Sequence, residues 1–81
     1  MTANSFTGSI NTDGQYKTLS SATGFTFTND KTYAMQVQNI AYLKISDAEF
    51  LFNNEKFYYT ANSDGIYIKT NGYATITILE I

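Results

Sequence analysis

The chain has 81 residues, which suits one small domain, and it contains neither cysteine nor histidine, so disulfides, thiolate metal sites and imidazole sites are excluded. Its net charge of −2 comes from seven acidic residues and five lysines, and the lysines are scattered singly. Nucleic acids and anionic membranes are recognised by clustered cations, so neither is expected as a partner. A domain this small must bury a large share of its apolar surface. Its seven Tyr and six Phe side chains could supply that burial, and so could association with a second copy.

The sequence pattern predicts neither an export signal nor a membrane span. No apolar run approaches the ~20 residues of a transmembrane helix. Residues 1–5 have neither the basic region nor the apolar region of a signal peptide. We therefore expect synthesis in a cytoplasm and no contact with a membrane.

The first third of the chain predicts a hairpin and a short third strand. Phe6–Ile10 alternates like a strand, and Asn11–Gly14 ends in Asp-Gly, which tolerates the positive φ of a tight turn. We expect Tyr16–Leu19 to pair back on the first strand. Ser20–Gly24 predicts a loop or at most one helical turn, and Phe25–Phe27 predicts a short strand.

The middle of the chain predicts four short strands separated by turns. Asn39-Ile40 interrupts the first pair of strands, Asn53–Lys56 interrupts the second pair, and Ser46-Asp47 turns between the pairs. The four strands are the alternating runs Thr32–Gln38, Ala41–Ser46, Glu49–Phe52 and Phe57–Thr60.

The last part of the chain predicts two strands, Ile66–Lys69 and Ala74–Leu79, around Asn71-Gly72, the strongest hairpin dipeptide of the sequence. The final strand carries no charge, although exposed edge strands are normally protected by charges or proline. It is therefore either central in its own sheet or covered by another chain. The apolar Ile81 that follows it favours the second possibility.

These patterns together predict the fold class. Turn signals recur every ~8–12 residues and no segment has convincing helical periodicity. We expect an all-β protein, a single domain over residues 1–81. It would be a compact antiparallel β-sandwich or barrel of about seven to nine short strands, with no significant helix.

No pattern of catalytic residues emerges from the sequence. A nucleophilic Ser needs a base, usually His, and no Ser-x-x-Lys spacing offers a substitute. Two loops, Asn11–Gly14 and Asn62–Gly65, lack the acidic first and last positions of a calcium loop. We therefore expect no enzyme activity, no cofactor and no metal. The acidic residues in or beside turns, which suit turns better than glycoside chemistry, are Asp47, Glu49, Glu55 and Asp64.

Outward-facing tyrosines are the informative feature. If Leu43 and Ile68 face the core, their neighbours in the same strands face outward, and at least one ring of Phe57-Tyr58-Tyr59 does so too. Three interpretations stay open: ordinary cross-strand packing, a subunit interface, and a platform on which a glycan stacks. The candidate interface or ligand-contact residues are Tyr42, Lys44, Tyr58, Tyr67 and Lys69.

Residues 32–81 resemble small virion proteins of tailed phages and prophages. The resemblance is carried by a strand that ends in Gln38-Asn39, by the run Ile66-Tyr67-Ile68-Lys69 after a Gly-containing turn, and by the closing strand from Ala74 to Glu80. Ile81 departs from that closing pattern, and residues 1–31 carry no resemblance.

The resemblance implies a non-enzymatic structural protein of the virion. Such proteins are compact β-sandwiches that decorate the capsid or form head-fibre or tail components, commonly as trimers or higher rings. It implies homo-oligomerisation, docking on other virion proteins and a location in the virion after synthesis in the host cytoplasm. The alternative function is a small carbohydrate- or receptor-binding module that uses its surface tyrosines.

Overall fold

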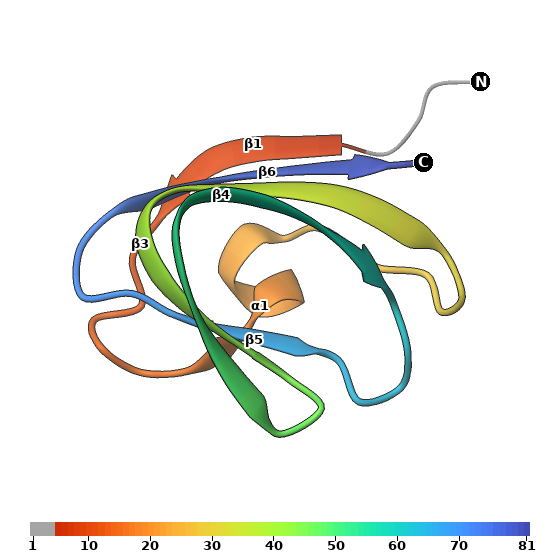
Figure 1. Cartoon of the computed structure of the whole chain (residues 1–81), viewed down its shortest axis with the longest axis horizontal. Helices are drawn as coiled ribbons and strands as arrows, with labels where there is room; N and C mark the ends of the chain where they lie inside the picture. Colours follow the sequence, from red (N-terminus) through yellow and green to blue (C-terminus); the bar gives the residue numbers. More distant parts are fainter. Residues whose placement is uncertain (1–4) are drawn as a thin grey trace.

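Residues 5–81, which the computed structural model describes, form one antiparallel β-sheet that curls around a short helix, α1 (Leu19–Thr23) (Figure 1). The predicted all-β class without significant helix is confirmed. Apart from Ser5, the segment that lacks signal-peptide features lies outside the described residues. The strands are β1 (Ser5–Ile10), β2 (Lys17–Thr18), β3 (Thr32–Ile45), β4 (Ala48–Thr60), β5 (Ile66–Lys69) and β6 (Ala74–Glu80).

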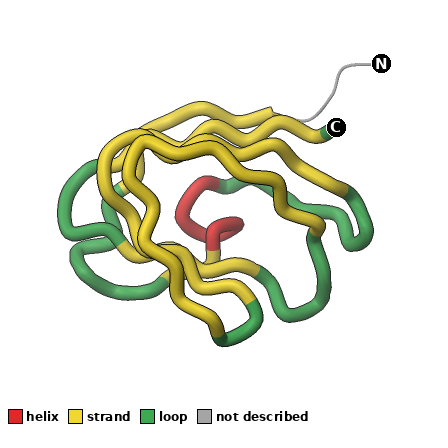
Figure 2. Tube along the Cα trace, in the orientation of Figure 1, coloured by secondary structure: helices red, strands yellow, loops and turns green. Residues whose placement is uncertain are grey.

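Strand β3 is the centre of the sheet because it pairs with three other strands. Strand β4 runs antiparallel along both halves of one edge of β3. On the other edge, β6 pairs with the first half of β3 and β5 pairs with the second half. Strand β1 then adds to β6, and β2 adds to β5. The sheet therefore has two halves that share the continuous strands β3 and β4, as the yellow tube in Figure 2 shows.

The two interruptions predicted at Asn39-Ile40 and Asn53–Lys56 are kinks inside long strands, not breaks. Val37 pairs with Glu55 and Ile40 pairs with Asn53, so β3 has one residue more than β4 across this stretch. Such a bulge bends the bulged strand. Asn39 and Asn54 both have positive φ, and the Asn39 N–H donates to Asn54 Oδ1 at 2.9 Å. The four strands predicted in the middle of the chain are therefore the two long strands β3 and β4, and the kink bends both around the core.

The turn predicted at Ser46-Asp47 is confirmed, and the two predicted hairpins are wrong. The Ser46-Asp47 turn joins β3 to β4, and both residues have positive φ, as a two-residue type I′ turn requires. The hairpin predicted around Asn11–Gly14 is wrong, since β1 pairs with β6 and β2 with β5. Its loop is instead bound to the segment after β5, where Gly14 N–H donates to the Thr70 carbonyl at 2.7 Å. Asn71-Gly72 likewise joins two strands that both pair with β3.

Aromatic side chains and α1 fill the concave side of the sheet. Of the two possibilities predicted for Ser20–Gly24, the helical turn is the one that forms; it begins at Leu19, which was expected in a strand and is fully buried. The strand predicted at Phe25–Phe27 is wrong, because this segment pairs with no strand of the sheet. Both rings instead contact Tyr33 edge to face, with centroids 5.6 and 4.9 Å from the Tyr33 centroid. The Thr28 N–H donates to the Tyr33 hydroxyl at 2.7 Å, which holds this loop against the core.

Strand β6 lies between β1 and β3, so the first of the two predicted possibilities holds and its uncharged sequence belongs inside the sheet. The long free edge is β4, whose 13 residues pair on one side with β3. Within the described part of the chain, no helix has the length and apolar character needed to span a membrane.

Candidate functional site

The convex face of the sheet brings four of the five candidate residues together. Leu43 and Ile68 are fully buried on the concave side, so their neighbours in β3 and β5 project from the convex side. Across the strands, Tyr42 pairs with Lys69 and Lys44 pairs with Tyr67. We call these four residues, with Tyr16, the Tyr–Lys cluster. Tyr58 lies apart from it, on β4 in the other half of the sheet.

Part of the Tyr–Lys cluster is satisfied by its own contacts. The Lys69 ammonium lies 4.9 Å from the Tyr16 ring centroid, 4.7 Å from that of Tyr42 and 4.0 Å from Glu49 Oε2. The Tyr16 hydroxyl donates to the same Glu49 oxygen. Burial, followed by this hydrogen bond, raises the pKa of Tyr16 to about 12. The Lys69 ammonium therefore lies against both the Tyr16 ring and the Tyr42 ring, and the ring faces that it contacts are covered from solvent.

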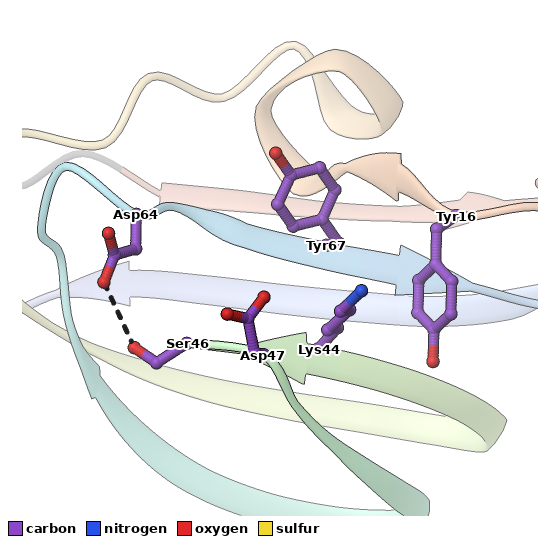
Figure 3. Close-up of a pocket in the computed structure, with 6 residues that line it drawn as sticks. All are labelled: Tyr16, Lys44, Ser46, Asp47, Asp64 and Tyr67. Atoms are coloured by element: carbon purple, nitrogen blue, oxygen red, sulfur yellow. Dashed lines mark hydrogen bonds between the residues drawn. The ribbon is translucent and has the colours of Figure 1, made fainter.

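A polar hollow of about 510 Å³ adjoins this network (Figure 3). The convex face supplies Lys44 and Tyr67, the β3–β4 turn supplies Ser46 and Asp47, and the turn before β5 supplies Asp64. Tyr16 closes the far end. A volume of this size falls within the usual range for small-molecule sites. The hollow is lined by Tyr16, Lys44, Ser46, Asp47, Asp64 and Tyr67.

The charged groups of the hollow have unused hydrogen-bonding capacity. Asp64 accepts a long hydrogen bond of 3.5 Å from Ser46 Oγ, and its own N–H donates to Asn62 Oδ1 at 2.9 Å. The Lys44 ammonium lies 5.8 Å from the Tyr16 ring centroid and forms no ion pair with Asp47 or Asp64 of the described chain, whereas Lys69 pairs with Glu49. An ammonium and two carboxylates thus face the same space with most of their donors and acceptors open.

Tyr58 belongs to an apolar surface on the other half of the convex face. Tyr58 is 74% exposed and pairs with Ala34 of β3. On its other side, Ala34 pairs with Leu79 of β6, which is 47% exposed. We call Ala34, Tyr58 and Leu79 the Tyr58 patch. A shallow hollow of about 320 Å³ lies over it and extends to Lys56 and Gln36. The patch adjoins the free edge of β4.

The carboxylates of the described residues are divided between the hollow and other places. Over residues 5–81 there is no set of three or more His, Cys, Asp or Glu side chains that would hold a metal ion. Of the carboxylates considered from the sequence, Asp47 and Asp64 line the same hollow, whereas Glu49 is engaged by Tyr16 and Glu55 lies at the kink of β4. The arrangement suits recognition of a polar ligand or of another surface.

Tyr16 is the contact residue that sequence reasoning missed. It precedes β2, which pairs with β5, and this pairing carries Tyr16 to the convex face beside Lys69. A prediction that paired this segment with Phe6–Ile10 placed it elsewhere. No local signal marks Tyr16, because its position depends on a long-range pairing.

Comparisons with known proteins give no match: no family model fits the chain, and no curated protein or solved structure is significantly similar to it.

Proposed function

We propose that this domain is a non-enzymatic structural protein of a phage-type virion, a capsid decoration, head-fibre or tail component. It assembles with copies of itself as a trimer or higher ring and docks on other virion proteins. The observation that carries the proposal is the Tyr58 patch. The resemblance of residues 32–81 to small virion proteins supplies the biological setting.

The Tyr58 patch has the composition of an interface core. Tyrosine is enriched at the centres of protein–protein interfaces, because its ring is large and amphipathic and loses little conformational entropy when it is buried. Tyr58 and Leu79 leave large apolar side chains in water on a convex, accessible face. Ala34 between them is small, and the hollow over it would receive a partner's side chain.

The neighbouring edge of β4 makes a second copy the best occupant. An edge strand offers a row of backbone N–H and C=O groups that another strand can pair. The patch and this edge are continuous, so one neighbour would contact both. The charged residues Glu55 and Lys56 beside the kink interrupt this edge, which disfavours strand addition along its whole length.

Sedimentation velocity and light scattering over a wide concentration range test the proposal. We expect a mass of three copies or more, and we expect Tyr58→Ser to raise the dissociation constant at least tenfold, or about 1.4 kcal/mol. Tyr73→Ser is the matched control, because Tyr73 is 71% exposed but lies outside the patch, in the turn before β6.

A strict monomer at high concentration would contradict self-assembly, and a dimer would contradict the ring. Equal effects of Tyr58→Ser and Tyr73→Ser would remove the patch from the interface. Detection of the protein in purified particles, and the position of its gene beside capsid and portal genes, test the virion setting separately.

A small carbohydrate- or receptor-binding module is the second candidate function. The observation that favours it is the polar hollow between Tyr16 and Tyr67, which has open carboxylates and an open ammonium. The Tyr58 patch does not suit that role, because its residues offer few hydrogen-bonding groups.

A further inference from the structure

We infer that the hollow lined by Tyr16, Lys44, Asp47, Asp64 and Tyr67 is a binding site for a neutral saccharide. This inference rests on the second candidate function and names its ligand class, and it does not depend on the proposed assembly, because the hollow and the Tyr58 patch occupy different halves of the convex face. The ligand class follows from the shape of the hollow and from its combination of rings, acceptors and a donor.

The aromatic part of the site is Tyr67, with Tyr16 at the opposite end. Tyr67 is 39% exposed and lies on the convex side of β5 next to the open space (Figure 3). A pyranose ring has an apolar C–H face that packs on an aromatic ring, while its rim carries hydroxyl groups. Tyr16 is held by Glu49 and Lys69, so it forms a fixed wall.

The polar part of the site matches a ring of hydroxyl groups. Asp47 and Asp64 are acceptors, and a carboxylate oxygen takes stronger hydrogen bonds than a neutral acceptor does. Lys44 offers up to three donors to a hydroxyl or ring oxygen. A saccharide hydroxyl both donates and accepts, so one ligand can use all three groups, which do not pair with one another.

The same groups disfavour other ligands. Two carboxylates repel phosphate and acidic sugars, and the single ammonium of Lys44 does not offset both. The ammonium groups of Lys44 and Lys69 already lie 5.8 and 4.9 Å from the Tyr16 ring centroid, so the hollow lacks the free pair of rings that a quaternary ammonium prefers. Two carboxylates are too few to enclose a metal ion, and no third acidic, His or Cys ligand of the described chain joins them. A neutral, hydroxyl-rich ligand remains.

Nitrogen-15 NMR titration of the full chain with maltose, lactose and chitobiose, followed by a glycan array, tests the inference. We expect at least one neutral saccharide to shift the amide signals of Lys44, Asp64 and Tyr67 at about 10 mM, which is tenfold above a Kd of ~1 mM. Tyr67→Ala and Asp64→Asn should each weaken that affinity at least tenfold, whereas Tyr67→Phe, which keeps the ring, should retain most of it.

Tyr58→Ser and Tyr73→Ala are the controls, and both should bind the saccharide as the unmodified chain does. The inference is overturned if no neutral saccharide shifts these signals or binds on the array, if binding is confined to acidic saccharides, or if Tyr67→Ala binds with unchanged affinity. Because Tyr58→Ser breaks the proposed assembly and spares this site, failure of one proposal can be told from failure of the other.

Discussion

Two buried threonines join loops from opposite ends of the chain, and replacing one of them tests the hydrogen bonds that fix the fold. Thr12, after β1, and Thr70, after β5, are 2% and 1% exposed. Thr12 N–H donates to Thr70 Oγ1 at 2.9 Å, and Thr70 N–H donates to Thr12 Oγ1 at 2.8 Å. Thr12 Oγ1 also donates to the Thr70 carbonyl at 3.3 Å. Each hydroxyl therefore satisfies the other residue's buried amide.

The substitution Thr12→Val keeps the volume and removes the oxygen, which leaves the Thr70 N–H without a partner in a site closed to water. A buried unpaired donor costs about 1–3 kcal/mol. We expect the free energy of unfolding to fall by about 2 kcal/mol, which lowers the melting temperature by about 8–16 °C in a domain of this size. Urea denaturation followed by circular dichroism measures the loss.

Thr12→Ser is the control, since it keeps the oxygen and loses one methyl group, worth about 0.8 kcal/mol. Thr70→Val should cost about as much as Thr12→Val, because it leaves the Thr12 N–H unpaired. The loss in the double variant should depart from the sum of the two single losses, because Thr12 and Thr70 are in contact and share one hydrogen-bond network. The reasoning is refuted if Thr12→Val is no less stable than Thr12→Ser.

Two further predictions concern a raised pKa and a turn. Tyr16, with a pKa of about 12 in the folded protein against 10.0 ordinarily, stabilises the fold fully below pH 10 and loses this contribution between pH 10 and 12. Tyr16→Phe should remove the tyrosinate absorbance step near pH 12 and flatten the fall in stability over that range; an unchanged titration curve would contradict the assignment. Gly24→Ala should cost about 1 kcal/mol from the left-handed backbone alone, at φ +78°, because an added Cβ meets no atom within 4 Å. Thermal unfolding measures this cost, and a loss above ~3 kcal/mol would point to a steric clash instead.

Local sequence patterns predicted where the strands and turns of this fold lie better than they predicted which strands pair with each other. Alternation identified the buried face of β3, and Ser46-Asp47 identified the β3–β4 turn, because both depend on neighbours in sequence. The Asp13-Gly14 and Asn71-Gly72 turns also exist, but they join strands that pair elsewhere. Turn chemistry specifies that the chain changes direction and does not specify which strand it joins.

The interrupted strands illustrate a second limit. Asn39 and Asn54 have the composition of turn residues, and both adopt the positive φ that turns use. They lie opposite each other across β3 and β4, so the ladder continues past them as a kink. Whether such residues end a strand or only kink it depends on whether the strand stays paired both before and after them. The sequence of one strand alone does not specify this pairing.

The candidate residues were predictable only to the level of a face. Alternation with Leu43 and Ile68 placed Tyr42, Lys44, Tyr67 and Lys69 outward, and the structure places them there. The alternation did not predict that the Lys69 ammonium would lie over the Tyr42 ring. Nor did it predict that Asp47 and Asp64, from two separate turns, would line the same hollow as Lys44. Those juxtapositions arise from the curl of the sheet.

The central position of β3 has a consequence for the order in which the chain folds. The β3–β4 hairpin closes through a two-residue turn, so its contacts form at little cost in chain entropy. Strand β1 pairs with β6 from the opposite end of the sequence, with Ser5 beside Leu79, and that pairing requires closure of nearly the whole chain. We expect the hairpin to form early and the β1–β6 pair to form last, so that hydrogen exchange is slowest in β3 and unfolding begins at β1.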